Sequence, residues 1–118
     1  MPGRLTTHVL DTAQGCPAAG VNILLYRVTG NSHKKIAEAL TNADGRTDAP
    51  ILEGKAFRAG GYEMIFQTGG YLEAAGLDLP DPKFLDQIPV RFGIHDAEQH
   101  YHVPLLFSPF GYSTYRGS

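Results

Sequence analysis

The clearest strand pattern of this chain lies in residues 100–107, which read HYHVPLLF. Successive side chains of a β-strand point to opposite faces, so His100 and His102 share one face. The other face carries only core-type side chains: Tyr101, Val103, Leu105 and Phe107. Because the histidine face continues with Pro104 and Leu106, it is too mixed for a core and too apolar for a plain solvent face. We therefore expect it to line a pocket or an interface.

Short apolar runs recur outward from this segment and are separated by Gly, Pro, Asn and Asp. Their spacing predicts antiparallel strands in an all-β sandwich. The expected strands are residues 5–11, 21–29, 34–41, 61–67, 89–94, 101–107 and 112–116, with two short ones near Arg46 and Glu53. One short helix is expected at residues 70–76, where Gly76 ends it. Asn42-Ala43-Asp44-Gly45 predicts a turn that delivers Arg46 at a strand start.

Length and composition favour one globular domain over residues 1–118. The formal net charge is −2, and no basic cluster is longer than Lys34-Lys35, so the electrostatic footprint of nucleic-acid binding is missing. The amino terminus has no apolar signal segment, and no run is long enough for a membrane span, which predicts a cytoplasmic protein. Cys16 is the only cysteine, which excludes an internal disulfide and a cysteine-based zinc site.

Five histidines are present, and histidine is the side chain that titrates near neutral pH. His100 and His102 on one strand face are spaced for shared zinc ligation, but a third ligand is missing, since the nearest candidates, His95 and Asp96, lie across an expected turn. A metal-free pocket and a solvated strand face remain open alternatives. Alternation in residues 5–11 places His8 on one face with Thr6 and Leu10.

Other catalytic signatures are missing from the sequence. It contains no GxSxG elbow, no Walker loop and no dinucleotide fingerprint. The carboxyl end instead stops abruptly at Tyr115-Arg116-Gly117-Ser118, whereas most domains end loosely. Two interpretations stay open: the last side chains take part in a site, or an edge strand simply ends there.

These segments together resemble the 5-hydroxyisourate hydrolases, a family with the transthyretin fold. The likeness lies in residues 115–118, in residues 100–106 followed by Ser108-Pro109, in residues 5–11, and in residues 42–47. It extends from Leu5 to Ser118, and the combination is far more specific than any single motif.

The resemblance implies a two-sheet sandwich of about eight strands with one short helix, assembled as a homotetramer, a dimer of dimers with active sites in a central channel. By match to the motifs, the site residues are His8, Arg46, His102, Tyr115 and Ser118. His8, Arg46, His102 and Ser118 are expected to be catalytic, and His8, Arg46, Tyr115 and Ser118 to bind substrate. No metal and no cofactor are expected, and no catalytic role is assigned to His100.

The implied reaction is hydrolysis of 5-hydroxyisourate to 2-oxo-4-hydroxy-4-carboxy-5-ureidoimidazoline in urate degradation. Opening a cyclic amide needs an activated water, donors to the oxyanion and a proton for the leaving nitrogen. His8 and His102 would move the protons, and Arg46 would hold the carbonyl oxygens. Tyr115 would shape the pocket, and Ser118 would orient water or a histidine. Two other functions remain open: a small-molecule carrier of the transthyretin type, and a His-x-His metallohydrolase.

Overall fold

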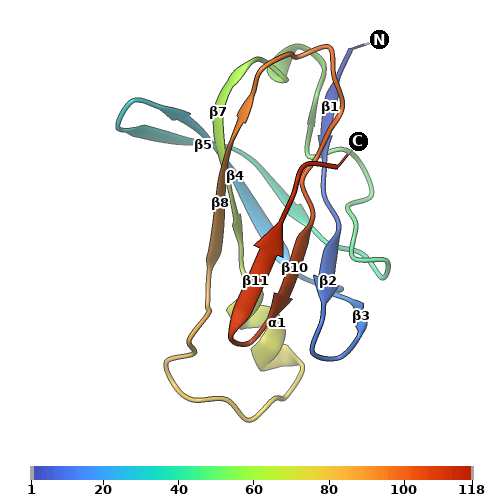
Figure 1. The fold of residues 1–118 in the computed structure, drawn as a ribbon, viewed down its shortest axis with the longest axis vertical. Helices are drawn as coiled ribbons and strands as arrows, with labels where there is room; N and C mark the ends of the chain where they lie inside the picture. Colours follow the sequence, from blue (N-terminus) through green and yellow to red (C-terminus); the bar gives the residue numbers. More distant parts are fainter. Residues whose placement is uncertain (1, 118) are drawn as a thin grey trace.

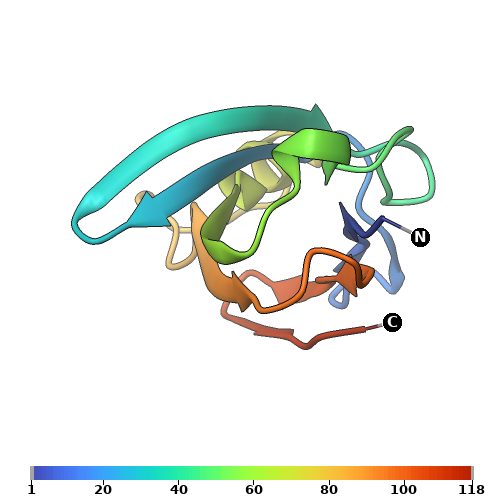
Figure 2. The same ribbon diagram turned by 90° about the horizontal axis from the view of Figure 1, so that it is seen from above.

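The computed structural model describes residues 2–117, which form two sheet layers around one apolar core (Figure 1). One layer is an antiparallel sheet with the strand order β5-β4-β7-β8. Its strands are β4 (Asn22–Thr29), β5 (Ser32–Leu40), β7 (Gly60–Phe66) and β8 (Ile88–Ile94). β4 and β5 form a long hairpin that projects from the body of the sandwich (Figure 2).

The second layer consists of two short sheets with the orders β6-β1-β9 and β11-β10-β2-β3. Its strands are β1 (Arg4–Thr6), β2 (Val9–Asp11), β3 (Cys16–Pro17), β6 (Leu52–Glu53), β9 (Tyr101–His102), β10 (Leu105–Ser108) and β11 (Gly111–Thr114). The two sheets are joined because residues 4–11 and residues 101–108 each run through both of them. They lie across the core from the first layer (Figure 2).

The core is filled from both layers by side chains at alternate strand positions, as expected for a sandwich. Along residues 101–107, the aromatic and apolar set at odd positions is buried, whereas His102 is only half-buried. In β7, Tyr62, Met64 and Phe66 are fully buried. The sequence prediction of a core face in residues 101–107 is therefore confirmed.

A single α-helix, α1 (Thr68–Ala74), packs at one end of the sandwich, and a 3-10 turn, η1 (Gly54–Ala56), follows β6. Leu72 of α1 is buried, and the chain leaves the helix through Gly76, whose φ of +74° favours glycine. The helix begins two residues before the predicted start. Within residues 2–117, no helix is long and apolar enough to cross a membrane.

The sandwich and its one α-helix match the prediction, but three details differ. The predicted strands 5–11 and 101–107 are each divided in two, and their mutual pairing is parallel rather than antiparallel. A strand near Glu53 is present as β6, whereas the strand predicted near Arg46 is wrong, because residues 43–49 form turns and bends. With the added strand β3, the described part of the chain has eleven short strands.

Candidate functional site

The candidate site is built on the parallel pairing of the first strand with residues 101–108. Thr6 lies opposite His102 in the β1–β9 pair, and the backbone N–H of Val103 donates to the carbonyl oxygen of Thr6 at 2.9 Å. One step further, the N–H of Leu105 donates to the carbonyl of His8, also at 2.9 Å. Because side chains alternate, this register turns Thr6, His8 and His102 to the outer face of the layer, where all three are half-buried.

A threonine hydroxyl connects the two histidines of the His-x-His segment. Thr6 Oγ1 lies 2.8 Å from His100 Nε2 and 2.8 Å from His102 Nδ1. The two imidazole rings have centroids 6.3 Å apart, so Thr6 joins them rather than the rings bonding directly. Both histidines are thereby held on the same side of the sheet, as their spacing predicted.

Arg46 reaches this face through the predicted turn. The Asn42 side-chain oxygen accepts hydrogen bonds from the N–H groups of Asp44 (2.9 Å) and Arg46 (3.2 Å), and the Gly45 N–H donates to the Asn42 carbonyl at 2.9 Å. These bonds close the loop locally, which explains why a turn rather than a strand carries Arg46.

The turn docks on the strand that carries His8. The N–H of Val9 donates to the Gly45 carbonyl at 2.8 Å, and His8 Nε2 lies 2.8 Å from the Asp44 carbonyl oxygen. Since a carbonyl oxygen only accepts, this contact assigns the proton to Nε2 of His8. Gly45 has φ +74°, and a Cβ there would lie 2.4 Å from the Val9 carbonyl oxygen, so the close approach requires glycine.

These segments surround an open cavity of about 450 Å³. Its walls are residues 46–50, Arg4, Thr6, Thr7, His100 and His102. The volume lies in the range of ordinary small-molecule sites. Two guanidinium groups, two imidazoles and the carboxylate of Asp48 line it, so hydrogen-bond donors prevail and the cavity suits a small, oxygen-rich ligand.

Both cavity histidines are shifted toward their neutral form. Burial lowers the pKa of His102, and the nearby Arg46, His100 and His8 lower it further. Burial also lowers the pKa of His100, with a contribution from Arg4. A neutral imidazole at physiological pH has a nitrogen lone pair that can accept a proton, which is the requirement for a general base.

The C-terminal segment also returns to His102. The N–H of Gly117 donates to the His102 carbonyl at 2.6 Å, and the two residues form an isolated antiparallel bridge. A Cβ on Gly117 would lie 2.8 Å from Cδ2 of the His102 ring, so only glycine allows this approach without displacement. The predicted site residue Ser118 lies outside the described residues.

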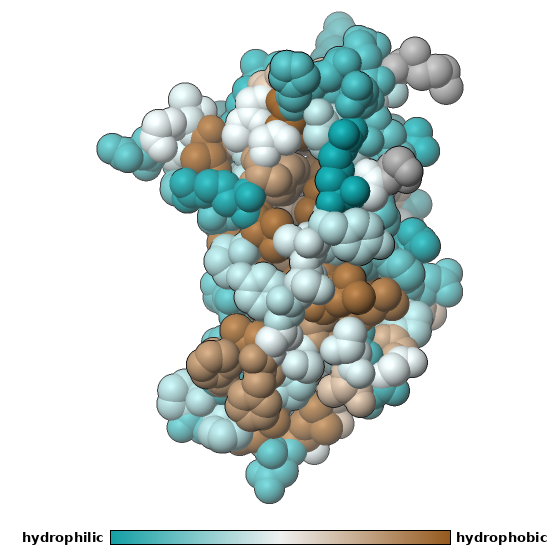
Figure 3. All heavy atoms as spheres, in the orientation of Figure 1, coloured by the Kyte–Doolittle hydropathy of each residue, from teal (hydrophilic) through white to brown (hydrophobic). Residues whose placement is uncertain are grey.

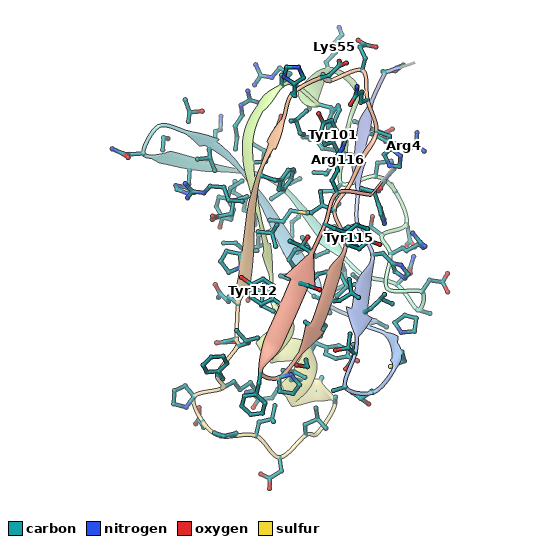
Figure 4. All side chains as sticks on the ribbon, viewed as in Figure 1. Arg4, Lys55, Tyr101, Tyr112, Tyr115 and Arg116 are labelled. Atoms are coloured by element: carbon teal, nitrogen blue, oxygen red, sulfur yellow. The ribbon has the colours of Figure 1, made fainter. Side chains whose placement is uncertain are left out.

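Tyr115 is not placed in the histidine-lined cavity of this chain. It lines a smaller cavity of about 220 Å³ together with residues of β8 and with Tyr101 and Arg116, and it is 59% exposed. Arg116 stacks over the Tyr101 ring at 4.2 Å from its centroid and donates to Gln99 Oε1 at 3.0 Å (Figure 4). The role of Tyr115 in substrate binding therefore stays a prediction.

The structure thus brings Arg46 and His102 together in the cavity and places His8 near His102 but outside the cavity lining, and it adds groups that the sequence left without a role. These are Thr6, Arg4 and the loop of residues 47–50. Thr6 could have been found, because alternation already placed it on the face of His8. Among residues 2–117, no three His, Cys, Asp or Glu side chains are grouped to hold a metal ion.

Fold and site together define a class: small β-sandwich proteins with a polar, histidine-lined cavity for a small molecule. Residues 5–117 match the model of the HIUase/Transthyretin family. The chain belongs to this family. A 5-hydroxyisourate hydrolase of Pseudomonas aeruginosa is 60% identical over 116 residues, which cover 98% of this chain and 92% of that protein.

Three solved structures are also similar. A crystal structure of (S)-allantoin synthase superimposes with a TM-score of 0.94 at 48% identity; the match covers 99% of this chain but only 44% of that longer one. The structure of the Klebsiella pneumoniae 5-hydroxyisourate hydrolase superimposes with a TM-score of 0.81 at 35% identity, and the match covers 98% of this chain and 99% of that one. Sea bream transthyretin in complex with thyroxine superimposes with a TM-score of 0.85 at 30% identity, and the match covers 97% of this chain and 94% of that one. The expected transthyretin-like fold is confirmed.

Proposed function

We propose that this chain hydrolyses 5-hydroxyisourate to 2-oxo-4-hydroxy-4-carboxy-5-ureidoimidazoline. The name of the Pseudomonas relative and the near-complete coverage of both chains support this substrate. The observation that carries the proposal is the cavity in which a half-buried His102, with a lowered pKa, lies near Arg46 and His8. A carrier needs a cavity but has no use for a proton acceptor of this kind.

In the proposed reaction, water attacks the carbonyl carbon of a cyclic amide bond. His102 takes the proton of the attacking water at Nε2, because Nδ1 is occupied by Thr6. Arg46 donates to the oxygen on which negative charge develops. The C–N bond then breaks, and the leaving nitrogen receives the proton from the His102 imidazolium, which returns His102 to its neutral form. His8, whose Nε2–H is held by the Asp44 carbonyl, keeps Nδ1 as a hydrogen-bond acceptor.

Other parts of the proposal concern the whole protein. We infer a single domain, a homotetramer and a cytoplasmic location, with Tyr115 and Ser118 completing the substrate site. The free edges of β8 and β11 and the exposed Tyr112 support self-association. The proposed reaction uses no metal ion, and treatment of the protein with a chelator tests whether activity depends on one.

The proposal is tested by following the ultraviolet absorbance of freshly generated 5-hydroxyisourate with and without the protein. We expect acceleration that survives treatment with a chelator and falls by about 100-fold or more in His102→Asn, since general acid–base catalysis contributes on that order. His33→Asn, at the exposed start of β5, is the control and should retain full activity.

The other function classes predict different results. A carrier of the transthyretin type would bind the compound without accelerating its decay, whereas a metallohydrolase would lose activity on chelation and regain it on adding zinc. Either result would replace the proposed function.

A further inference from the structure

A threonine hydroxyl lies between the two histidines of the cavity. Thr6 Oγ1 contacts His100 Nε2 and His102 Nδ1 at the same distance, 2.8 Å. A hydroxyl has one proton to donate and two lone pairs that accept, so at least one imidazole must donate to Thr6, and the Thr6 proton is then available to the other imidazole. The Thr6 hydroxyl can therefore couple the two rings, with one imidazole donating to Oγ1 and the other accepting its proton.

We propose that Thr6 is a positioning residue that holds His102 in the tautomer with its proton on Nδ1 and its lone pair on Nε2. In this arrangement His102 Nδ1–H donates to Thr6 Oγ1, and the Thr6 hydroxyl donates to His100 Nε2. His100 is then the acceptor at the end of the chain, and Nε2 of His102 is left for the substrate water. Its importance for catalysis rests on the proposed hydrolase activity.

The backbone makes Thr6 suited to this task. It lies directly opposite His102 in the parallel β1–β9 pair, and its carbonyl accepts from Val103, so its Cα position relative to His102 is fixed. A β-branched side chain has few χ1 rotamers, which limits where Oγ1 can lie. Both flanking residues, Leu5 and Thr7, are buried, which anchors the strand beneath the cavity.

The electrostatic surroundings favour a neutral acceptor at His100. Burial and Arg4 lower the pKa of His100, and burial, Arg46, His100 and His8 lower that of His102. Outside the pair, Arg4, Arg46 and His8 contribute to these shifts, and Asp48 lines the same cavity. With both rings neutral, His102 can donate to the Thr6 hydroxyl while His100 accepts its proton. An imidazolium at His100 can only donate to Thr6, which frees the Thr6 proton for His102 Nδ1 and so favours the His102 tautomer with its proton on Nε2, the tautomer that cannot act as the base.

The test compares Thr6→Val, which keeps the shape and removes the hydroxyl, with Thr6→Ser, which keeps the hydroxyl. Thr12→Val is the matched control, because the Thr12 hydroxyl also donates across the layer, to the Phe107 carbonyl at 3.0 Å, but outside the cavity. For each protein, kcat and KM are measured over pH, and the ring nitrogens of His102 are observed by ¹⁵N NMR without substrate.

We expect Thr6→Val to lower kcat by about 10- to 100-fold with KM nearly unchanged, because the base is mispositioned while the cavity persists. Its His102 should lose the preference for a proton on Nδ1. Thr6→Ser should retain most of the activity and the wild-type nitrogen shifts, and Thr12→Val should match the wild type.

The proposal is overturned if Thr6→Val keeps the wild-type kcat, if Thr6→Ser is as impaired as Thr6→Val, or if the His102 nitrogen shifts do not change on loss of the hydroxyl. If the wild type itself fails to hydrolyse 5-hydroxyisourate, the proposed function is lost. The NMR comparison still decides the Thr6 bridge in that case, since it needs no substrate.

Discussion

At the scale of single residues, the cavity holds two imidazoles in an environment that disfavours their charge. Burial is the main cause of the lowered pKa of both His100 and His102, and Arg4 and Arg46 add to it. This differs from a solvated strand histidine, for which no such penalty arises. The same environment that provides a neutral base therefore makes protonation of the folded protein unfavourable.

We predict that the protein loses stability as the pH falls through and below 6.5, the ordinary pKa of histidine. Below that pH the unfolded chain binds protons at positions 100 and 102 that the folded chain still excludes, so protonation favours unfolding. The loss should continue until the folded-state pKa values are passed. Urea unfolding at several pH values between about 7.5 and 5 measures it.

His102→Asn provides the comparison for that measurement. Because one of the two shifted groups is removed, the free energy of unfolding should depend less steeply on pH than in the wild type, whatever its absolute value. Equal slopes in both proteins would show that His102 is not shifted in the folded state.

At the scale of structural elements, the turn of residues 42–46 connects the stability of a loop with the geometry of the site. Its Gly45 has a left-handed φ and touches the Val9 carbonyl, whereas Gly15 has a similar φ of +70° with open space where a Cβ would lie. We predict that Gly15→Ala costs only the backbone strain of about 1 to 2 kcal/mol. Gly45→Ala should cost more and should also lower activity, because the displaced turn carries Arg46 away from the cavity.

Thermal unfolding and kcat/KM of the two variants check this prediction. Equal losses of stability, together with unchanged activity in Gly45→Ala, would mean that the turn does not need its contact with Val9 to position Arg46.

The alternation of polar and apolar side chains along the strands was the main source of the sequence predictions for these elements. It correctly indicated that Thr6 and His8 share a face and that residues 101–107 have a core face. The alternation of side chains along a strand is the same whichever strand it pairs with. It could therefore not reveal that residues 5–11 pair in parallel with residues 101–107, although this pairing places Thr6 beside His102. The strand predicted near Arg46 failed because side-chain bonds from Asn42 closed a local loop instead.

At the scale of the whole molecule, the site occupies one face of the sandwich, and other parts of the surface have strand edges and apolar side chains that a second copy of the chain could cover. Within residues 2–117, β8 and β11 are the last strands of their sheets, so each has a backbone edge with no neighbouring strand, and all four residues of β11 are exposed. Apolar side chains gather over the lower half of the face shown in Figure 3. Phe84 and Phe110 are 71% and 61% exposed, and their ring centroids lie 6.1 Å apart.

Unpaired edges with exposed aromatic residues are typical of surfaces that associate, since both the backbone groups and the apolar area gain from contact. We predict that the protein sediments at four times its 12.8 kDa monomer mass. Tyr112→Lys should shift it toward smaller species, because a lysine on β11 resists desolvation at the edge. Leu40→Lys, at the opposite edge of the sandwich on β5, should leave the mass unchanged. A wild type that sediments as a monomer at full activity would contradict the tetramer and would place the whole catalytic site within one chain.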